Sequence, residues 1–451
     1  MANVQLIHKI SKLFQPISAV SKASHLENKD ALSKSQKLLV ELGIIRPASQ
    51  GHFYFLPLGI RILDKLKAIV VKEMSNINAQ RVTFPSLTNA RLWKKSGRIE
   101  DELSSELFKV HDRHDATYIL SPTHEESAAD LLASVSQMSY KQFPLRLYQI
   151  TSKFRDEMKP RFGLIRSREF VMKDLYSFDV NIDKAKESYN EICQSYDRIF
   201  KQIGIDVIKV LGPSGNMGGS VSHEYHYVAP IGEDKLLSCL KCGYKANVQL
   251  SGRDKCPQCS NTTELAFVNG LEVGHTFLLG DKYSRPLKAF YKSDSDEMVP
   301  VQMGSYGLGL SRIVASVVEV LSTEHEIRWP SSLAPFSVVI IPPKAGSKEE
   351  KAAGNCVDFI SSSLNQIPSL QNDIILDDRL NLTVGKRLMD AKRVGYPYIV
   401  VIGSKLLENP PLYELIDVKN DLITFLSLDA LFDFFRNRKL IIDQEEIIAA
   451  L

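Results

Sequence analysis

One stretch of the chain combines arginine, glutamate and phenylalanine side chains that suit a bound nucleotide. Arg155 and Glu157 close one strand-like segment, and Arg166 and Phe170 begin the next one after a short basic loop. A guanidinium group presents a planar fork to phosphate oxygens, so Arg155 suits an α-phosphate and Arg166 the distal phosphates. The Phe170 ring offers a flat face to a purine. The same residue types also form surface ion pairs on exposed hairpins, and that alternative stays open at this point.

A second stretch, residues 304–312, is rich in glycine and ends in arginine. Gly307 and Gly309 let a ligand approach the backbone closely, and the apolar segment 313–321 predicts a helix whose N-terminal end favours negative charge. Arg312 lies where its side chain can reach back over a nucleotide. The stretch lacks the lysine of a phosphate-binding P-loop, so alone it is weak evidence.

Four cysteines form two Cys-x2-Cys pairs, Cys239 with Cys242 and Cys256 with Cys259. Four thiolates suit tetrahedral Zn²⁺ and leave no open position, so the predicted zinc is structural. The 13 residues between the pairs, 243 to 255, fall slightly short of the usual spacing of about 15–20. The alternative is a set of four free thiols. The pattern does not resemble a disulfide framework.

The composition of the 451 residues is that of an ordinary globular protein, with 44% hydrophobic and 24% charged residues. No segment approaches the roughly 20 apolar residues of a membrane-spanning helix, so we expect no membrane partner. Basic residues number 56 and acidic residues 53, and residues 1–26 hold three lysines and no acid. The rest of the chain is therefore neutral, and any contact with nucleic acid must come from local basic patches.

The N-terminal segment is basic and acid-poor, and its apolar residues recur at helical spacing: Leu6, Ile7, Ile10, Leu13, Phe14 and Ile17. This pattern is typical of an organellar transit peptide, which we predict over residues 1–29, with the mitochondrial matrix as destination. The segment lacks arginine, and the alternative is a frayed N-terminal helix.

Apolar periodicity predicts helices and strands of an α+β domain over the first 330 residues. The expected helices are 31–43, 59–77 and 183–203, and the expected strands are 81–85, 145–154 and 169–178. Residues 329–335 read as a linker. Beyond it, strands at 337–342, 373–377 and 398–402 alternate with helices at 348–364 and 383–394, which predicts a small α/β domain with a largely parallel sheet.

Taken together, these stretches resemble the class II aminoacyl-tRNA synthetases. The second motif of that class matches Phe154, Arg155, Glu157, Arg166, Phe170 and Asp174. Its third motif, a glycine-rich turn that ends in arginine, matches Gly307, Gly309 and Arg312. Its first motif, a long helix and a strand that ends in proline, matches residues 59–85. Three motifs in the right order are much more specific than any one of them.

Within that class, several short sequence segments are similar to those of the prolyl-tRNA synthetases of the bacterial and mitochondrial kind. The matching segments are 121–126, 159–163, 219–224, 272–277, 376–379 and 395–397. The resemblance implies a class II catalytic domain with an antiparallel sheet over residues 30–332, carrying a small four-cysteine insertion at 236–262. An α/β anticodon-binding domain is implied over residues 333–451.

The resemblance also implies roles for single residues. Arg155 binds the substrate carboxylate and the α-phosphate, Glu157 and Phe170 hold the adenine, and Arg166 and Arg312 grip the distal phosphates of ATP. Thr123 and Glu125 accept hydrogen bonds from the secondary ammonium group of proline, which a hydroxyl and a carboxylate suit chemically. His275 lines the proline pocket, unless it is merely structural.

The partners follow from the same resemblance: ATP with Mg²⁺, proline, tRNA(Pro) and a second copy of the chain in a homodimer. Gln302 stands where an acidic Mg²⁺ ligand is expected, so the sequence names no Mg²⁺ ligand. The alternatives are a class II enzyme for threonine or serine, a non-catalytic paralogue, and an unrelated zinc-ribbon nucleic-acid protein.

The interval from Asp174 to Gly304 is too short for the large editing domain that bacterial enzymes of this type carry. A proline pocket discriminates weakly against smaller alanine, because one methylene is worth only about 1–3 kcal/mol. We therefore expect that this chain does not hydrolyse Ala-tRNA.

Overall fold

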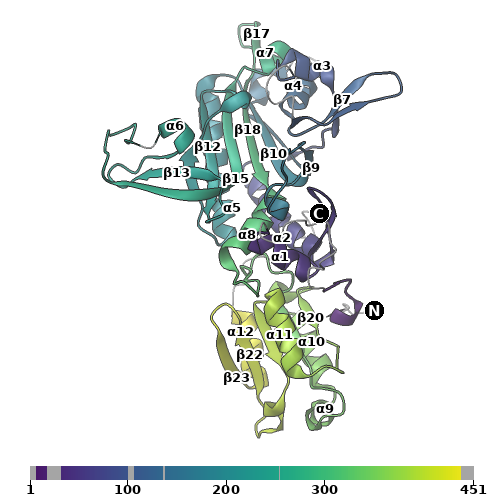
Figure 1. Cartoon of the computed structure of the whole chain (residues 1–451). Coiled ribbons are helices and arrows are strands. Elements are labelled where there is room, and N and C mark those ends of the chain that lie inside the picture. The colour runs from purple at the N-terminus through teal and green to yellow at the C-terminus, as the bar shows by residue number, and fades with distance from the viewer. Residues whose placement is uncertain (1–6, 18–31, 100–105, 136–137, 253, 438–451) are drawn as a thin grey trace.

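The computed structural model describes residues 7–17, 32–99, 106–135, 138–252 and 254–437. It places a large domain above a smaller one, whose sheet includes β19 (Val338–Ile341) (Figure 1). A nine-stranded sheet is the centre of the large domain, and a six-stranded sheet is the centre of the small one. Within these described ranges, no helix combines the length and the apolar character that crossing a membrane requires.

Four long antiparallel strands form the middle of the nine-stranded sheet: β9 (Leu145–Phe154), β10 (Glu169–Asp179), β18 (Gln302–Gly309) and β15 (Leu265–Gly280). The predicted hairpin of the first two strands is thereby confirmed. The remaining strands are β4 (Gln80–Arg81) beside β9, and β13 (Asp234–Cys239), β14 (Lys245–Asn247), β11 (Ile208–Leu211) and β12 (Val221–Val228) beyond β15.

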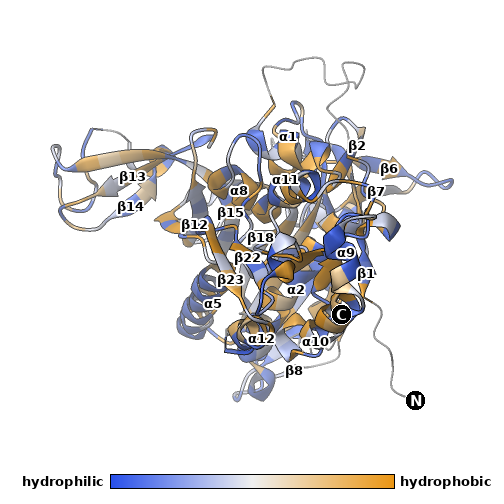
Figure 2. Ribbon diagram, turned by 90° about the horizontal axis from the view of Figure 1, so that it is seen from below, coloured by the Kyte–Doolittle hydropathy of each residue, from blue (hydrophilic) through white to orange (hydrophobic). Residues whose placement is uncertain are grey.

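Amphipathic helices pack against this sheet and against each other: α1 (Lys34–Glu41), α2 (Pro57–Asn76), α5 (Ile182–Ile203) and α8 (Leu310–Leu321). The helix expected at 183–203 is α5. Its apolar stripe is buried along its whole length, from Ala185 to Ile203, and its outer face is hydrophilic (Figure 2). Burying such a stripe is what makes a surface helix stable in water. The α+β class predicted for this domain is confirmed.

The upper part of the large domain consists of two three-stranded sheets and short helices (Figure 1). The strands are β5 (Leu87–Asn89), β6 (Lys109–His111), β7 (Thr117–Leu120), β8 (Met138–Ser139), β16 (Phe290–Lys292) and β17 (Met298–Pro300). The helices are α3 (Ala90–Lys95), α4 (Glu125–Ser134) and α7 (Ser284–Leu287). A hairpin of β2 (Ile45–Ser49) and β3 (His52–Phe55) precedes α2. A side arm carries β13, β14 and α6 (Val248–Ser251), and the segment 236–262 lies in it (Figures 1 and 2).

The small domain contains four parallel strands: β1 (His8–Lys9), β20 (Ile374–Leu376), β19 and β21 (Tyr398–Val401). The prediction of a largely parallel sheet is thereby confirmed. Two antiparallel strands that the sequence did not predict complete the sheet: β22 (Tyr413–Asp417) and β23 (Leu422–Leu426). Its helices are α9 (Lys348–Ala353), α10 (Cys356–Asn365), α11 (Val384–Val394) and α12 (Leu428–Asn437).

Three element predictions were wrong in detail. The strand expected at 81–85 ends at Arg81, because the chain leaves the sheet and the Phe84 N–H donates to the Gln149 side chain at 2.9 Å. The helix expected at 348–364 is two helices, since Gly354 adopts a φ of 46° between them. The glycine-rich segment before Arg312 is the end of β18, which passes directly into α8.

Residues 7–17 of the predicted transit peptide are part of the folded protein, and they are not α-helical. Strand β1 pairs with β20, and the Ser11 N–H donates to Asp378 Oδ1 at 2.9 Å. Further along, Gln15 Nε2 donates to the Leu42 carbonyl at 2.9 Å, and Pro16 accepts a hydrogen bond from Arg46 at 2.8 Å. The segment therefore contacts both domains. The rest of the predicted transit peptide lies outside the described residues.

The two domains share a buried polar junction centred on Asp373. The Lys65 ammonium lies 2.8 Å from Asp373 Oδ1 and donates to the Ala334 carbonyl at 2.6 Å. Arg61 adds a contact to Asp373 at 3.1 Å. The predicted linker is not a free tether, because Trp329, Leu333 and Ala334 are buried in a core that continues from one domain to the other.

Replacing Asp373 by asparagine should destabilise the junction strongly. Burial lowers the pKa of Lys65 and the charge of Asp373 opposes this, so the variant leaves a buried ammonium without its counter-ion. We expect a loss of about 3–5 kcal/mol in the free energy of unfolding, measured by denaturant titration. Asp64→Asn is the matched control, because Asp64 pairs with the part-exposed Lys67 and should change stability by less than about 1 kcal/mol. Equal effects of the two substitutions would contradict the assignment.

Candidate active site

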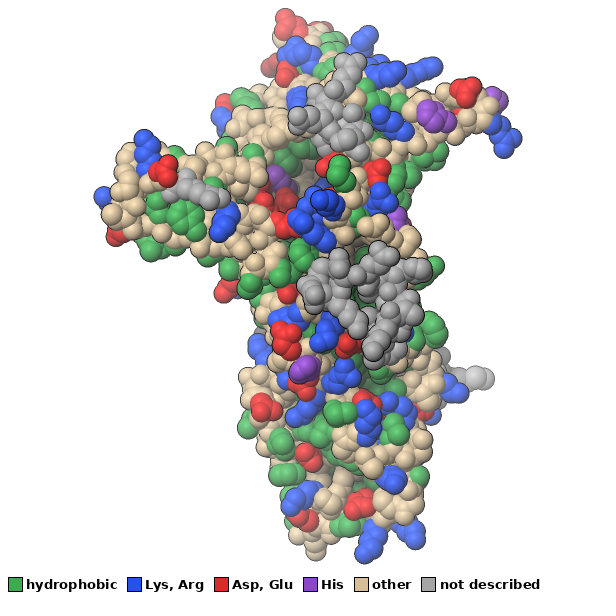
Figure 3. Space-filling model, viewed as in Figure 1, with side chains coloured by type: hydrophobic (Ala, Val, Ile, Leu, Met, Phe, Trp, Pro, Cys, Tyr) green, Lys and Arg blue, Asp and Glu red, His purple; other side chains and the backbone are tan. Residues whose placement is uncertain are grey.

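A cavity of about 280 Å³ opens over the middle of the nine-stranded sheet. On the front of the large domain, Figure 3 shows a recess that contains acidic and histidine side chains, with a group of basic side chains beside it. Eight of the predicted site residues line the cavity: Thr123, Glu125, Arg155, Phe170, His275, Gly307, Gly309 and Arg312. Segments that are far apart in the sequence thus meet at one place. Glu157 and Arg166 lie outside the cavity lining.

The carboxylate of Glu125 is held by three donors. Glu125 is the first residue of α4, where a helix favours negative charge, and it is fully buried. Its Oε1 accepts hydrogen bonds from Thr123 Oγ1 and Ser305 Oγ, both at 2.7 Å, and its Oε2 accepts one from Arg98 Nη1 at 3.1 Å. Because the Thr123 hydroxyl donates to Glu125, its lone pairs remain for another donor. This pair of acceptors suits a small ammonium group in the cavity.

A buried polar network holds the segment before α4 in place. The Tyr176 hydroxyl accepts a hydrogen bond from the His124 N–H and donates to Asp174 Oδ2, both at 2.8 Å. Lys153 Nζ lies 2.8 Å from Asp174 Oδ1. Although burial alone would raise it, Lys153 and His124 bring the pKa of Asp174 below its ordinary value. Asp174 is therefore an anion that anchors the Thr123–Glu125 segment to the sheet.

Two arginines bring positive charge to the cavity. Arg155 follows the end of β9, and its guanidinium lies 5.2 Å from the centre of the Phe170 ring on β10. Burial, and then the charge of Arg312, lower the pKa of Arg155. Two cations close enough to affect each other in this way form a site that favours an anion between them.

Arg312 is oriented by a chain of hydrogen bonds. Its Nη1 donates to the Glu272 carbonyl at 2.9 Å and lies 3.3 Å from Glu272 Oε2. Glu272 Oε1 is 2.8 Å from His275 Nδ1, and His275 Nε2 is 2.5 Å from Ser222 Oγ. Although burial opposes it, His275 and Arg312 lower the pKa of Glu272. His275 lines the cavity, but both of its nitrogens are already engaged.

Gly307 and Gly309 leave the cavity floor bare at the end of β18. A Cβ at Gly307 would lie 3.6 Å from Met172 Sδ, and one at Gly309 would lie 3.4 Å from Arg312 Cβ. The surrounding protein would thus tolerate a methyl group at Gly307. Since both glycines line the cavity, their missing side chains leave space for a ligand.

The loop between β9 and β10 carries its own ion pairs. Arg166 Nε lies 2.9 Å from Glu157 Oε2, and Arg166 Nη1 lies 2.7 Å from Glu233 Oε2. Glu233 also pairs with Arg161. The surface ion pairs considered for this hairpin are therefore present in the protein alone, and a bound nucleotide would have to exchange them.

Sequence reasoning missed several polar or sulfur-containing cavity residues, among them Arg98, Met217, Glu272 and Ser305. Arg98 and Met217 come from segments without any spacing signal, and only the fold brings them to the cavity. Glu272 belongs to the segment 272–277, which matches the family, so it could have been recognised from the sequence as a candidate site residue.

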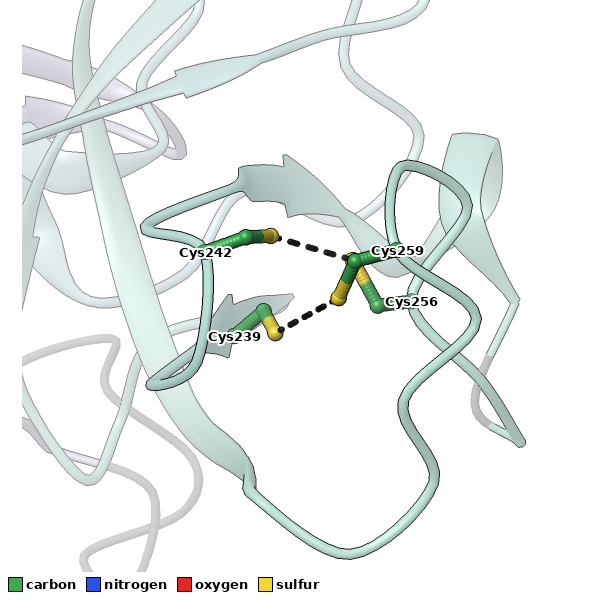
Figure 4. A group of neighbouring side chains, drawn as sticks. All are labelled: Cys239, Cys242, Cys256 and Cys259. Atoms are coloured by element: carbon green, nitrogen blue, oxygen red, sulfur yellow. Dashed lines mark hydrogen bonds between the residues drawn. The ribbon is translucent and has the colours of Figure 1, made fainter.

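The four paired cysteines converge at one point in the side arm (Figure 4). Cys239 Sγ is 3.6 Å from Cys259 Sγ, Cys242 Sγ is 3.6 Å from Cys256 Sγ, and all four sulfurs lie within 4.8 Å of one another. Tetrahedral zinc with Zn–S bonds of about 2.3 Å requires sulfurs about 3.8 Å apart. The donor set and its geometry fit a structural zinc ion.

Two family descriptions match the chain. "tRNA synthetase class II core domain (G, H, P, S and T)" matches residues 108–321, which include the cavity from Thr123 to Arg312. "Anticodon binding domain" matches residues 337–438, which cover nearly all of the small domain.

Curated relatives match over most of their own length. The chain is 41% identical to "Probable proline--tRNA ligase, mitochondrial" of Rattus norvegicus over 434 residues, 94% of this chain and 90% of the relative. It is 35% identical to "Proline--tRNA ligase" of a Wolbachia strain over 412 residues, 88% of this chain and 93% of the relative.

Solved structures share the fold. The prolyl-tRNA synthetase of Giardia lamblia, solved with prolyl-adenylate, superposes with a TM-score of 0.74 at 17% identity, over 93% of this chain and 81% of that one. The enzyme of Cryptosporidium parvum, solved with L-proline and AMP, gives a TM-score of 0.69 at 18% identity, over 92% and 76%. From its motifs, its two domains and these relatives, the chain belongs to the proline–tRNA ligases, a family of class II aminoacyl-tRNA synthetases.

Proposed function

We propose that this protein activates proline with ATP and transfers the prolyl group to the 3′ end of tRNA(Pro). The observation that carries the proposal is the composition of the cavity: Glu125 with Thr123 beside Arg155 with Arg312. An amino acid needs acceptors for its ammonium group, and its carboxylate and the phosphates of ATP need cations. The relatives named above carry this activity in their names.

In the proposed reaction these residues position the substrates and stabilise the charge on the phosphates. Thr123 and Glu125 would hold the secondary ammonium group of proline, while Arg155 would hold its carboxylate next to the α-phosphate. The carboxylate oxygen then attacks the α-phosphorus in line, and pyrophosphate leaves. Arg166 and Arg312 would neutralise the distal phosphates, which requires both side chains to exchange their present carboxylate partners. Glu157 and Phe170 would hold the adenine.

Mg²⁺ would accompany ATP. Glu272 lines the cavity, and one ligand atom each from Glu224, Glu272 and His275 lie within 4.8 Å of one another. Mg²⁺ is commonly held by one or two carboxylates together with substrate phosphates, and it would neutralise charge on the leaving pyrophosphate. We propose Glu272 as its protein ligand. The role predicted for His275 becomes that of orienting Glu272 at the edge of the proline pocket.

The remaining partners follow from the family. The domain over residues 333–451 would read unstacked anticodon bases by their edges and by stacking. Two copies would form a homodimer through the region of α2 and β4. A targeting segment within residues 1–29 would direct the protein to the mitochondrial matrix, which accords with relatives named mitochondrial.

The proposal is tested by ATP–pyrophosphate exchange with a panel of amino acids. We expect exchange that depends on proline and falls at least about 100-fold in Arg155→Ala, since this substitution removes a cation from the site of charge development. Arg285→Ala is the control, because Arg285 is exposed and pairs only locally with Asp281.

Exchange with threonine or serine in place of proline would keep the class and overturn the substrate. If folded protein supported no exchange with any amino acid, the chain would be a non-catalytic paralogue.

Glu125→Gln should raise the KM for proline and leave the KM for ATP unchanged. The amide removes the negative charge that faces the ammonium group, which corresponds to about 10- to 100-fold in KM, measured by the same exchange assay. Glu73→Gln is the matched control, because Glu73 is also a buried glutamate, pairs with Arg198 and does not line the cavity. Equal changes in the KM for proline in both variants would contradict the assignment of Glu125 to the proline site.

We propose structural zinc on Cys239, Cys242, Cys256 and Cys259. Elemental analysis should find about one zinc per chain, lost in Cys242→Ser and retained in the control Cys356→Ser. A chelator should lower the thermal unfolding midpoint, because the arm has little apolar core of its own to replace the metal. Four thiols that titrate freely in the native protein as isolated would contradict the site.

A further inference from the structure

Arg98 is the most completely enclosed cation that borders the cavity. It is 2% exposed, and its guanidinium lies 4.6 Å from the ring of Trp93 and 5.7 Å from the ring of Tyr283. Its Nη2 lies 3.3 Å from Met217 Sδ, and among the described residues its Nε has no hydrogen-bond partner. Aromatic rings and a thioether therefore hold the group in one orientation.

The guanidinium spans two carboxylates at the start of α4. Arg98 Nη1 donates to Glu125 Oε2 at 3.1 Å and to both oxygens of Glu126, at 3.2 and 3.1 Å. Both carboxylates are buried, at 0% and 1% exposure. Although burial opposes it, Glu126 and Glu125 raise the pKa of Arg98, and burial raises the pKa of Glu126. One cation and two anions leave this cluster with a net charge of −1 before any substrate binds.

The two carboxylates differ in how completely their acceptor positions are occupied by hydrogen bonds. Glu126 is satisfied within the protein, because Ser96 Oγ adds a hydrogen bond to its Oε1 at 2.7 Å. Within the part of the chain that the structure describes, Glu125 has two donors on Oε1 and one, Arg98, on Oε2, so one acceptor position on Oε2 is left. Arg98 decides where that position points.

We infer that Arg98 is a positioning residue for the amino-acid substrate: it aims the free acceptor of Glu125 at the ammonium group of proline. The inference rests on the proposed function, which assigns the ammonium group to Glu125. It adds that the cluster is complete only with the substrate, whose positive charge neutralises the remaining −1. A lysine at this position would keep the charge but lose the planar group that the rings of Trp93 and Tyr283 hold in one orientation.

The test separates aiming from mere charge balance with three variants: Arg98→Met, Glu126→Gln and the double variant. Arg98→Met leaves two buried anions without a cation and should unfold at a lower temperature. The double variant restores the net charge of −1 and should recover most of the unfolding temperature. Its KM for proline should nevertheless stay raised by about 10- to 100-fold, with an unchanged KM for ATP, because Glu125 still lacks its donor.

A double variant whose KM for proline returns to the wild-type value together with its stability would overturn the inference, since Arg98 would then only balance charge. Arg98→Lys provides the same comparison if the double variant does not fold: a normal KM for proline overturns the inference, and a raised one supports it. Exchange by the wild-type protein is measured first, so that failure of the proposed function is seen separately as a lack of proline-dependent exchange.

Discussion

The ion pair between Lys153 and Asp174 is the interaction on which the site depends. It lies in the interior of the sheet, with Lys153 fully buried, and it joins the adjacent strands β9 and β10. A charge in such a place is tolerated only when it is paired and hydrogen-bonded, and Asp174 also accepts hydrogen bonds from Gln149 and Tyr176. Through Tyr176 the same anion fixes the backbone before α4, where Glu125 begins. The position of a carboxylate that lines the cavity is thus set by a charge pair inside the sheet.

This arrangement explains why the cavity can be polar and still well ordered. Four of the charged groups that border it are paired with each other: Glu272 with Arg312, and Glu125 with Arg98. Partly satisfied polar networks are costly, whereas fully connected ones specify a single geometry. Under the proposed function, substrate binding would exchange partners at a few positions and leave the rest of the network unchanged.

Periodic features of the sequence were predictable. The stripe of α5, the β9–β10 hairpin and the alternation in the small domain all depend on local spacing, and the structure has them. Five cavity residues, Arg155, Phe170, Gly307, Gly309 and Arg312, were found because three motifs occur in order. What could not be predicted depends on long-range contacts. Arg98 could not be recognised as a site residue from the sequence, because Met217 and Tyr283 contact it only in the folded protein. The early end of β4 depends on another long-range contact, the hydrogen bond from the Phe84 N–H to the Gln149 side chain.

The pairing of β1 with β20 has a consequence for how the N-terminus can be processed. Residues 8 and 9 cover the outer edge of β20, and an uncovered strand edge is a template for pairing with other chains. Removing everything before residue 30 would expose that edge and also release the contacts of Gln15 and Pro16 with the large domain. The targeting segment proposed for this region would therefore meet two requirements: recognition by the import machinery before folding, and retention of residues 8 and 9 as a strand afterwards. Trimming that stops before residue 7 satisfies both demands.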